Sequence, residues 1–200
     1  RTGGAEVSRA EPDPGVAWML AFQAGDDLAF DKVVEEYQGA VFGMLRKILG
    51  PHSMVEDLAQ ETFIRVWRAR DRYRPRGRFT TWLYRISFNL ALNRIRDDKR
   101  QAVASIQEPG SPGGVIPDSA PNAAVEALGR ADWGVILDGA LSTLPENQRA
   151  ALVLQHYEGL DLPAIGEVLG IGPKAVKSLL HRGREKLRER LAPLRNREND

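Results

Sequence analysis

Basic side chains gather between residues 174 and 190 of the sequence, together with Ser178 and His181. This segment carries seven Lys or Arg residues against two Glu residues, a net charge of +5. Ammonium and guanidinium groups at this density neutralise phosphates, and neighbouring hydroxyl or imidazole groups can bond to the edges of bases. The chemistry that we expect from the segment is therefore the binding of a nucleic acid.

A second basic segment lies between residues 71 and 100, with nine Lys or Arg residues against three Asp residues and a net charge of +6. The whole chain of 200 residues carries only +1, so the residues outside the two segments sum to −10. Two basic islands in an acidic background indicate two separate contacts with a polyanion. For one island alone, a solvated helix face is as good an explanation as contact with a polyanion. For two islands in the same chain, it is the weaker explanation.

The other reactive side chains form no pattern typical of an enzyme. His52, His156 and His181 are far apart in the sequence, and none has the spacing of a metal ligand. No Gly-rich loop of the phosphate-binding kind is found. We therefore predict that the protein is not an enzyme and has no catalytic residue, no bound metal and no cofactor.

The composition is that of an ordinary globular protein, with 42% hydrophobic residues. No run of eighteen apolar residues and no secretory leader is found, so no membrane span is expected. Because the chain has no cysteine, it can form neither a disulfide framework nor a thiolate metal site. These features fit a cytoplasmic protein.

The elements that must position the basic segments are predicted to be helices, because no strand pattern and no internal repeat is found. The clearest helix is expected from 55 to 67, with a buried apolar stripe that includes Trp67. Its other face carries Asp57, Gln60 and Glu61. Such an amphipathic helix packs one face on a core and leaves the polar face for solvent or a partner.

A second long helix is expected from Trp82 to about Lys99, with Thr80 or Thr81 as its N-terminal cap. One line along this helix is polar and free of acids: Arg85, Asn89, Asn93 and Arg96. Amide and guanidinium groups on one face suit contacts with nucleic acid.

The segment from 101 to 121 is rich in Pro and Gly, which is typical of a flexible linker rather than of a loop inside one domain. The expected organisation is a disordered arm at 1–15, a helical domain at 16–100, the linker at 101–121 and a second helical domain at 122–195. The predicted fold class is all-α, with two helical domains.

The C-terminal domain contains the sequence form of a helix-turn-helix: a short helix in 161–170, a turn at 171–173 and a longer basic helix at 174–187. Such a unit lays its second helix in the major groove of DNA. The residues that we expect to contact base edges are Lys174, Lys177, Ser178 and His181. Those that we expect to contact phosphates are Arg182, Arg184 and Lys186. An ordinary αα-hairpin with a solvated basic helix is the alternative.

The order of these patterns resembles a known family. The segments Val55–Trp67 and Phe79–Arg96 resemble region 2 of an extracytoplasmic-function sigma factor of bacterial RNA polymerase. The segment Leu144–Arg149, with the helix-turn-helix, resembles region 4 of the same family. Together these motifs cover about residues 16 to 190, and their joint occurrence is more specific than the helix-turn-helix alone.

The resemblance implies roles for three groups of residues. Asp57, Gln60 and Glu61 would dock on the coiled coil of the polymerase β′ subunit. The basic helix at 174–187 would read the promoter's −35 element, roughly twenty base pairs from the −10 element. The −10 element would be bound by residues of the 71–96 segment: Tyr73, Arg76, Arg78, Arg85, Asn89, Asn93 and Arg96.

The −10 element is bound by this family with one base flipped out, and Asn89 matches the position expected to contact that base. The aromatic rings of Tyr73 and Trp82 would offer stacking to unpaired bases; for Trp82, packing in the core is the preferred alternative. The resemblance also implies an anti-sigma factor that covers the polymerase-binding and DNA-binding surfaces.

Some positions depart from the family's pattern. Ala175 replaces a usual Thr, and Ala164 and Gly166 vary a more acidic, Ala-rich segment. Gly183 stands where Ala is common, and a glycine inside a helix is expected to weaken it by about 1 kcal/mol.

Two other functions remain open from the sequence. An ordinary helix-turn-helix regulator would bind duplex DNA as a dimer, without RNA polymerase, and would leave the polar face at 55–67 without a role. An interaction protein would use its basic islands only for solvation.

Overall fold

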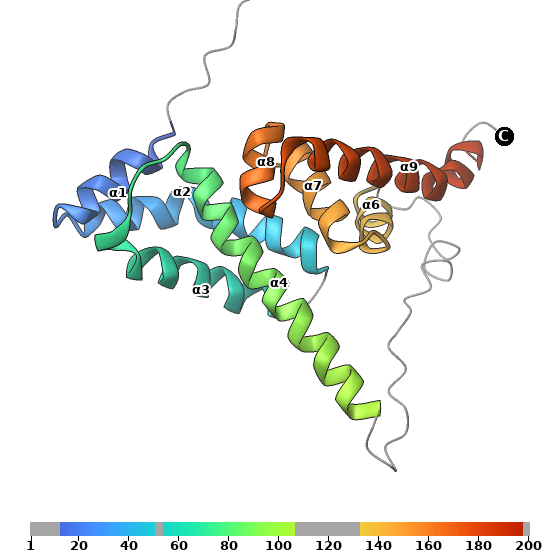
Figure 1. Ribbon diagram of the computed structural model, residues 1–200, viewed down its shortest axis with the longest axis horizontal. Helices are drawn as coiled ribbons and strands as arrows, with labels where there is room; N and C mark the ends of the chain where they lie inside the picture. The colour runs from blue at the N-terminus through green and yellow to red at the C-terminus, as the bar shows by residue number, and fades with distance from the viewer. Residues whose placement is uncertain (1–12, 51–53, 107–132, 198–200) are drawn as a thin grey trace, which may run out of the picture.

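The computed structural model describes residues 13–50, 54–106 and 133–197, and every regular element in these ranges is helical (Figure 1). This confirms the predicted all-α class. The helices are α1 (Gly15–Gln23), α2 (Leu28–Leu49), α3 (Val55–Arg68), the 3₁₀ turn η1 (Arg70–Arg72), α4 (Phe79–Ile106), α6 (Trp133–Ser142), α7 (Glu146–His156), α8 (Leu162–Leu169) and α9 (Pro173–Arg197).

The N-terminal helical group, α1 to α4, is built around α2. The buried face of α2 repeats every three or four residues, as the helical period requires, and includes Val33, Tyr37, Val41, Leu45 and Ile48. Helices α1, α3 and α4 all pack against it. Its end is set by Gly50, whose φ of +80° is a conformation that other residues rarely adopt.

The start of α4 is fixed by Asp13, which lies just before α1 at the other end of the N-terminal group in the sequence. The Asp13 carboxylate accepts hydrogen bonds from the Thr80 amide at 2.9 Å, from the Thr80 hydroxyl at 3.1 Å and from the Tyr37 hydroxyl at 2.5 Å. The helix begins at Phe79 rather than Trp82, so the expected capping role of Thr80 or Thr81 is wrong. Asp13 supplies the acceptor instead.

This network also sets the charge of Asp13. Burial alone would raise the pKa of its carboxyl, but the hydrogen bonds from Tyr37, Thr80 and the Gly15 amide outweigh burial and hold that pKa below its ordinary value. The residues from Asp13 onward therefore belong to the folded group, although the arm was expected to extend to residue 15.

In the C-terminal helical group, α6 to α9, most buried residues come from α7, α8 and α9, and they belong to the same apolar cluster as those of the N-terminal group. The largest buried side chains of the C-terminal group include Leu152, Leu154, Ile165, Val176 and Leu180. Most of the expected linker at 101–121 lies outside the described residues. Its first residues continue α4, which ends at Ile106, and the next described helix, α6, begins at Trp133. The remaining domain boundaries stay predictions.

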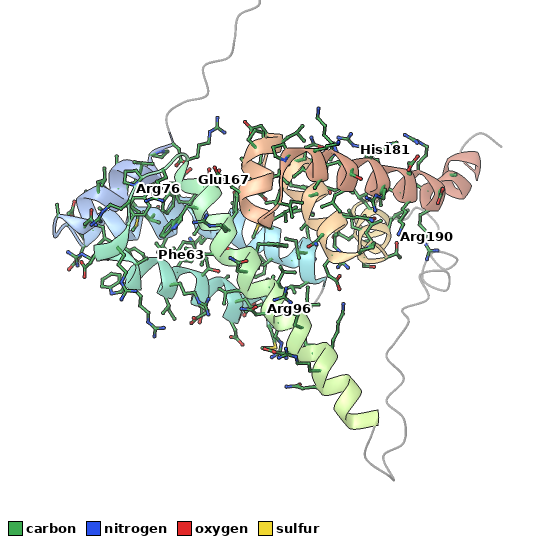
Figure 2. All side chains as sticks on the ribbon, in the orientation of Figure 1. Phe63, Arg76, Arg96, Glu167, His181 and Arg190 are labelled. Carbon is green, nitrogen blue, oxygen red and sulfur yellow. The ribbon has the colours of Figure 1, made fainter. Side chains whose placement is uncertain are left out.

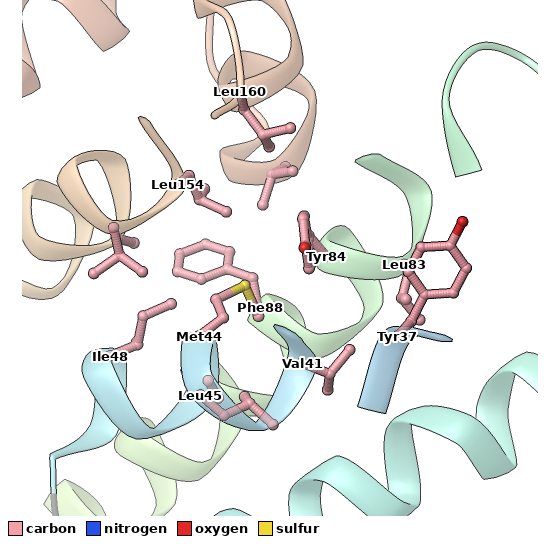
Figure 3. Packing of buried hydrophobic residues seen from close by; sticks show 14 of the residues in the cluster. Tyr37, Val41, Met44, Leu45, Ile48, Leu83, Tyr84, Phe88, Leu154 and Leu160 are labelled. Carbon is pink, nitrogen blue, oxygen red and sulfur yellow. The ribbon is translucent and has the colours of Figure 1, made fainter. Parts of the chain in front are cut away.

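The two helical groups lie against each other, with α4 beside α8 and α2 beside α6 and α7. Figure 3 shows side chains of both groups in one apolar cluster, where Phe88 of α4 lies with Met44 and Ile48 of α2 and with Leu154 and Leu160. The sequence predicted two domains joined by a linker, but its patterns contained no sign of this contact.

Polar contacts surround that cluster. The Tyr84 hydroxyl, on a side chain only 4% exposed, donates a short hydrogen bond to Glu158. Burial raises the pKa of the Glu158 carboxyl, although the hydrogen bond from Tyr84 and the charge of Lys47 act in the opposite direction. Lys47 also lies 3.6 Å from Asp138 and 4.1 Å from the ring centre of Tyr157.

Candidate nucleic-acid interface

The helix-turn-helix has the predicted order, formed by α8, a short turn and α9. The Asp161 side chain caps α8 by accepting from the Ala164 amide at 2.9 Å. Gly170 ends the helix in the left-handed conformation, with φ at +67°. The turn then closes with a hydrogen bond of 3.0 Å from the Ile171 amide to the Gly166 carbonyl.

Two glycines that looked like departures from the family's pattern have packing reasons. A Cβ atom on Gly166 would lie 2.7 Å from the Ile171 carbonyl oxygen, so only glycine allows this tight turn. A Cβ atom on Gly183 would lie 2.9 Å from the Leu152 side chain, because α9 packs closely on α7 there. Gly183 therefore lowers the helix propensity of α9 but permits a close helix contact.

The recognition helix α9 buries Val176 and Leu180 and turns its charged residues outward (Figure 2). Six of the seven residues predicted to contact DNA are exposed: Lys174, Lys177, His181, Arg182, Arg184 and Lys186. The seventh, Ser178, is half-buried, and its hydroxyl oxygen accepts from Arg182 at 2.7 Å. The helix thus presents a convex basic surface.

Two further side chains of this set have partners within the protein. Arg184 donates to the Gln155 side chain of α7 at 2.5 Å, which holds its guanidinium near the body of the domain. His181 lies 3.4 Å from Glu185, one turn further along α9. Lys174 and Lys177 stand nearest the start of the helix, where a recognition helix meets base edges.

The polar line of α4 is exposed as predicted. Arg85, Asn89, Asn93 and Arg96 follow one face of the helix at spacings of three or four residues. The opposite face buries Leu83, Tyr84, Phe88 and Ala91. The amide and guanidinium groups therefore project to solvent from a helix that the core holds rigidly.

At the N-terminal end of this line lies a cavity of about 520 Å³. Arginines dominate its lining, which consists of Ala69, Arg72, Tyr73, Arg74, Arg76, Gly77, Arg78, Thr81, Trp82, Arg85 and Glu167. Arg74 is held by hydrogen bonds to the carbonyl oxygens of Asp71 and Tyr73, at 3.1 and 2.7 Å. The cavity is thus concave and strongly basic, unlike the surface of α9.

The two aromatic residues at this cavity differ from expectation. Tyr73 is only 4% exposed, and its ring packs 4.9 Å from Trp82 and 6.2 Å from Phe79 between ring centres. Core contacts occupy the ring in this arrangement, although Tyr73 also lines the cavity, so its role in binding the −10 element stays a prediction. Trp82 is half-buried, so it packs on the core and still borders the cavity.

The third predicted surface lies on α3. Asp57 and Gln60 are exposed, whereas Glu61 is half-buried and forms an ion pair of 2.9 Å with Arg65. Of these three residues, Gln60 also lines an apolar groove of about 970 Å³ between α2 and α3. The groove is lined by Phe30, Val34, Gln38, Gly39, Phe42, Glu56, Ala59, Gln60, Phe63, Ile64, Trp67 and Arg68.

The sequence did not predict this groove, because it placed Trp67 on the buried stripe of the helix. Trp67 is 45% exposed and Ile64 is 43% exposed. Trp67 contacts Phe22 and Phe30, with ring centres 4.7 and 4.9 Å apart, and presents its outer side to solvent. Exposed apolar side chains of this size mark an interaction surface.

Comparison with known proteins decides the family. The family model for Sigma-70 region 2 matches residues 33–101, and the model for Sigma-70, region 4 matches residues 135–187. The chain is 34% identical over 180 residues to the ECF RNA polymerase sigma factor SigW of Bacillus subtilis, covering 85% of this chain and 92% of the relative. This chain belongs to the extracytoplasmic-function RNA polymerase sigma factors.

Further similarities agree with this assignment. The sigma factor is 36% identical over 186 residues to the ECF RNA polymerase sigma factor SigE of Mycolicibacterium smegmatis, covering 91% of this chain and 70% of the relative. The solved structure of CnrH in complex with the cytosolic domain of CnrY aligns with a TM-score of 0.66 at 25% identity. That alignment covers 90% of the sigma factor and 99% of CnrH.

The sigma factor RpoE of Bartonella quintana, solved with the anti-sigma factor NepR, has the same fold. Its TM-score is 0.65 at 22% identity, over 82% of this chain and 96% of that chain.

The matched regions coincide with the surfaces described above. Region 2 extends over most of α2, all of α3 and most of α4, and so contains the polar line and every lining residue of the groove except Phe30. Region 4 extends from α6 into α9 and contains the helix-turn-helix. The function of the chain is that of an RNA polymerase sigma factor, and no observation favours the dimeric regulator. Sigma factors are transcription initiation factors rather than enzymes.

Within 13–50, 54–106 and 133–197, no group of three or more His, Cys, Asp or Glu side chains could hold a metal ion. In the same ranges, no helix has the length and apolar character needed to cross a membrane.

Proposed function

We propose that this sigma factor uses three separate surfaces to place core RNA polymerase on a promoter. The polar residues and apolar groove of α3 bind the β′ coiled coil of the polymerase. The polar face of α4 and the arginine-lined cavity bind the −10 element, and α9 binds the −35 element. The observation that supports this division best is the position of the arginine-lined cavity, at the end of the exposed Asn89 and Asn93 face of α4.

The cavity and α4 have the properties that a single strand requires. An unpaired strand presents base edges and a flexible phosphate backbone, so it is bound by grooves that combine cations with hydrogen-bonding groups. The side chains of Asn89 and Asn93 offer amide donors and acceptors on the exposed face. Arg76 and Arg78 border the cavity and supply positive charge for phosphates. We assign contact with a flipped base to Asn89.

Helix α9 suits a duplex instead. Its N-terminal half leaves Lys174, Lys177 and His181 exposed, and this is the part of a recognition helix that enters the major groove. Arg182 and Lys186 lie further along and are proposed to contact phosphates, which adds affinity but no sequence information.

The surface on α3 joins charge with exposed apolar area. Asp57 and Gln60 offer acceptors to a basic partner, while Ile64 and Trp67 offer apolar contact beside them. Interfaces of this kind commonly have an aromatic anchor within a polar rim. A sigma factor that docks through this surface works where the polymerase is, which we take to be the cytoplasm.

An anti-sigma factor is proposed as the regulatory partner of this chain. The solved RpoE structure of Bartonella quintana is a complex with the anti-sigma factor NepR, and its fold is shared by this sigma factor. The apolar groove between α2 and α3 is a suitable surface for such a partner, because it is large and open to solvent. Binding there would compete with the polymerase.

The α3 assignment is tested with a double charge reversal, Asp57→Arg and Glu61→Arg. We expect this variant to lose binding to core polymerase in a pull-down and to give no run-off transcript, because a basic surface would repel a basic partner. The matched control is Glu35→Arg with Glu36→Arg, which changes the same charge at exposed positions of α2. Normal core binding by the Asp57 and Glu61 variant would contradict the proposed role of α3.

A further inference from the structure

We propose that helix α1 positions the arginine loop of the −10 surface from both ends of the loop, through Gln23 and Asp13, and so controls how tightly a single strand is held. The arginine loop is defined as residues 74–78, which contain three arginines and connect η1 to α4. This inference rests on the proposed function, because it takes the arginine-lined cavity to be part of the −10 surface.

The arginine loop has little support of its own. All five of its residues are exposed, and none of them belongs to a helix. It is flanked by two buried aromatic residues, Tyr73 at 4% exposure and Phe79 at 0%. A segment with so few buried contacts takes its position from the backbone at its two ends.

The first end of the loop is held by Gln23, the last residue of α1. Its side-chain amide donates to the Arg70 carbonyl at 2.9 Å and to the Tyr73 carbonyl at 3.4 Å. The Tyr73 carbonyl also accepts from the Arg74 guanidinium at 2.7 Å, so one oxygen joins Gln23 to the first arginine of the loop. Beside Gln23, the ring of Phe22 lies under the Arg70 guanidinium, 4.5 Å from its ring centre. The end of α1 thus fixes the backbone where the loop begins.

The second end of the loop is held by Asp13, just before α1. Its carboxylate accepts from the amide and the hydroxyl of Thr80, and the next residue, Thr81, lines the cavity. Gly15, the first residue of α1, packs so closely on Phe79 that a Cβ atom there would overlap the phenyl ring. The start of α1 thus fixes the backbone where the loop ends.

The helix between these two anchors is itself held by the core. Met19 and Phe22 are completely buried, and α1 packs on α2. Helix α1 also contacts both η1 and α4, which stand on either side of the loop (Figure 1). The match to Sigma-70 region 2 begins at residue 33, so it contains the arginine loop but not the helix that anchors it.

The consequence for DNA is preorganisation. A loop whose ends are fixed before DNA arrives loses less conformational freedom on binding. When either anchor is released, the guanidinium groups spread over more arrangements, and fewer of them meet the phosphates of one strand together. Loss of an anchor should therefore weaken binding of a single strand, although neither Gln23 nor Asp13 is proposed to touch DNA.

The first test is Gln23→Met in the full-length chain, which keeps the length and neutrality of the side chain but removes the donor. Binding of a single-stranded DNA 20-mer of random sequence is measured by anisotropy at low salt, at a temperature where circular dichroism shows a folded protein. We expect binding about three- to tenfold weaker than that of the unsubstituted chain.

The matched control is Thr62→Val. The Thr62 hydroxyl is buried in α3 and donates to the Leu58 carbonyl at 2.8 Å, so this change also removes one neutral bond to the backbone. Its binding of the 20-mer should be unchanged.

The second test uses the sign of the effect. Asp13→Ala removes a negative charge, and if charge alone mattered it would tighten binding of a polyanion. Positioning predicts the opposite, weaker binding. Asp13→Asn loses the same charge but keeps an oxygen acceptor for the Thr80 amide, so it should retain most of the affinity. Tighter binding by Asp13→Ala would overturn the inference.

The last test separates this inference from the proposed function. Arg76→Ala with Arg78→Ala removes two cations from the loop and should weaken binding of the 20-mer. Added to that double variant, Gln23→Met should cost little more, because the anchor acts through these arginines.

The outcomes are distinct. If Arg76→Ala with Arg78→Ala binds the 20-mer normally, the −10 role of the loop fails. If this double variant binds weakly, but Gln23→Met binds normally or its loss simply adds to that of the double variant, the loop keeps its role. Positioning by α1 is then rejected.

Discussion

The two basic surfaces of this sigma factor have similar net charge but opposite shapes. The N-terminal surface is concave, with an arginine-lined cavity at the end of an amide-bearing helix. The C-terminal surface is convex, a basic helix whose charged side chains point outward. The net charge of a surface therefore indicates that it binds a nucleic acid. Its shape indicates which form it binds, because a concave surface suits a single strand and an exposed helix suits the groove of a duplex.

The C-terminal surface should be lost selectively when its turn is broken. In Gly166→Val the new side chain would meet the Ile171 carbonyl oxygen, an atom of the backbone that cannot move without opening the turn. We expect a loss of about 1–3 kcal/mol in the free energy of unfolding and loss of duplex −35 binding, measured by urea denaturation and anisotropy.

Gly172→Ala is the control for that change. No atom lies within 4 Å of a Cβ at Gly172, so this substitution should leave both the stability and duplex binding close to normal. Equal damage from the two substitutions would mean that the turn tolerates no side chain anywhere, and that the contact at Gly166 is not the cause.

The N-terminal surface depends instead on a capping contact that is distant in sequence. Asp13→Ala removes the acceptor for the Thr80 amide and the Tyr37 hydroxyl, and leaves both donors partly buried. We expect a loss of about 1–3 kcal/mol in the free energy of unfolding, measured at pH 7 by urea denaturation. Glu35→Ala, at an exposed position of α2, should change stability far less.

The Asp13 effect should depend on pH. Its pKa in the folded protein is below the ordinary value of 3.8, so its contribution is complete above that pH and is lost as pH falls through the lowered pKa. The difference between the unsubstituted chain and Asp13→Ala should therefore be constant from pH 5 to 7 and shrink below about pH 3.8. A difference that grows in acid would contradict a carboxylate cap.

Smaller effects distinguish glycines of the two regions. Gly43 of α2 has no atom within 4 Å of its Cβ position, so Gly43→Ala should stabilise the protein by about 1 kcal/mol through helix propensity. Gly183→Ala should gain less, because its Cβ would press on the Leu152 side chain. Thermal unfolding of both variants measures this difference, and an equal gain would show that Leu152 yields freely.

The sequence predicted those features that depend on local spacing. The turn between α8 and α9, the exposed line of Asn89 and Asn93, and the polar positions Asp57 and Gln60 all follow from the helical period. Each lies on one helix or on two adjacent helices, so the residues that decide it are close in the chain. The all-α class follows for the same reason.

Features that join distant residues were not predictable. Asp13 caps a helix that begins 66 residues later, at Phe79, and no local pattern announces that contact. Tyr73 is buried because Phe79 and Trp82 happen to cover it, and Trp67 is exposed because the groove beside it is unfilled. The pairing of Tyr84 with Glu158 depends on how the two helical groups meet.

The central claim is that α4 captures the single strand of the −10 element, whereas α9 binds the −35 duplex. It is tested most directly by Asn89→Ala in polymerase holoenzyme. Run-off transcription is compared on a cognate duplex promoter and on the same promoter with a pre-melted −10 element, with binding to duplex −35 DNA measured in parallel. We predict weaker transcription from the duplex, partial recovery on the melted template and normal −35 binding. Equal transcription by the variant and the unsubstituted protein on the duplex would contradict strand capture by α4.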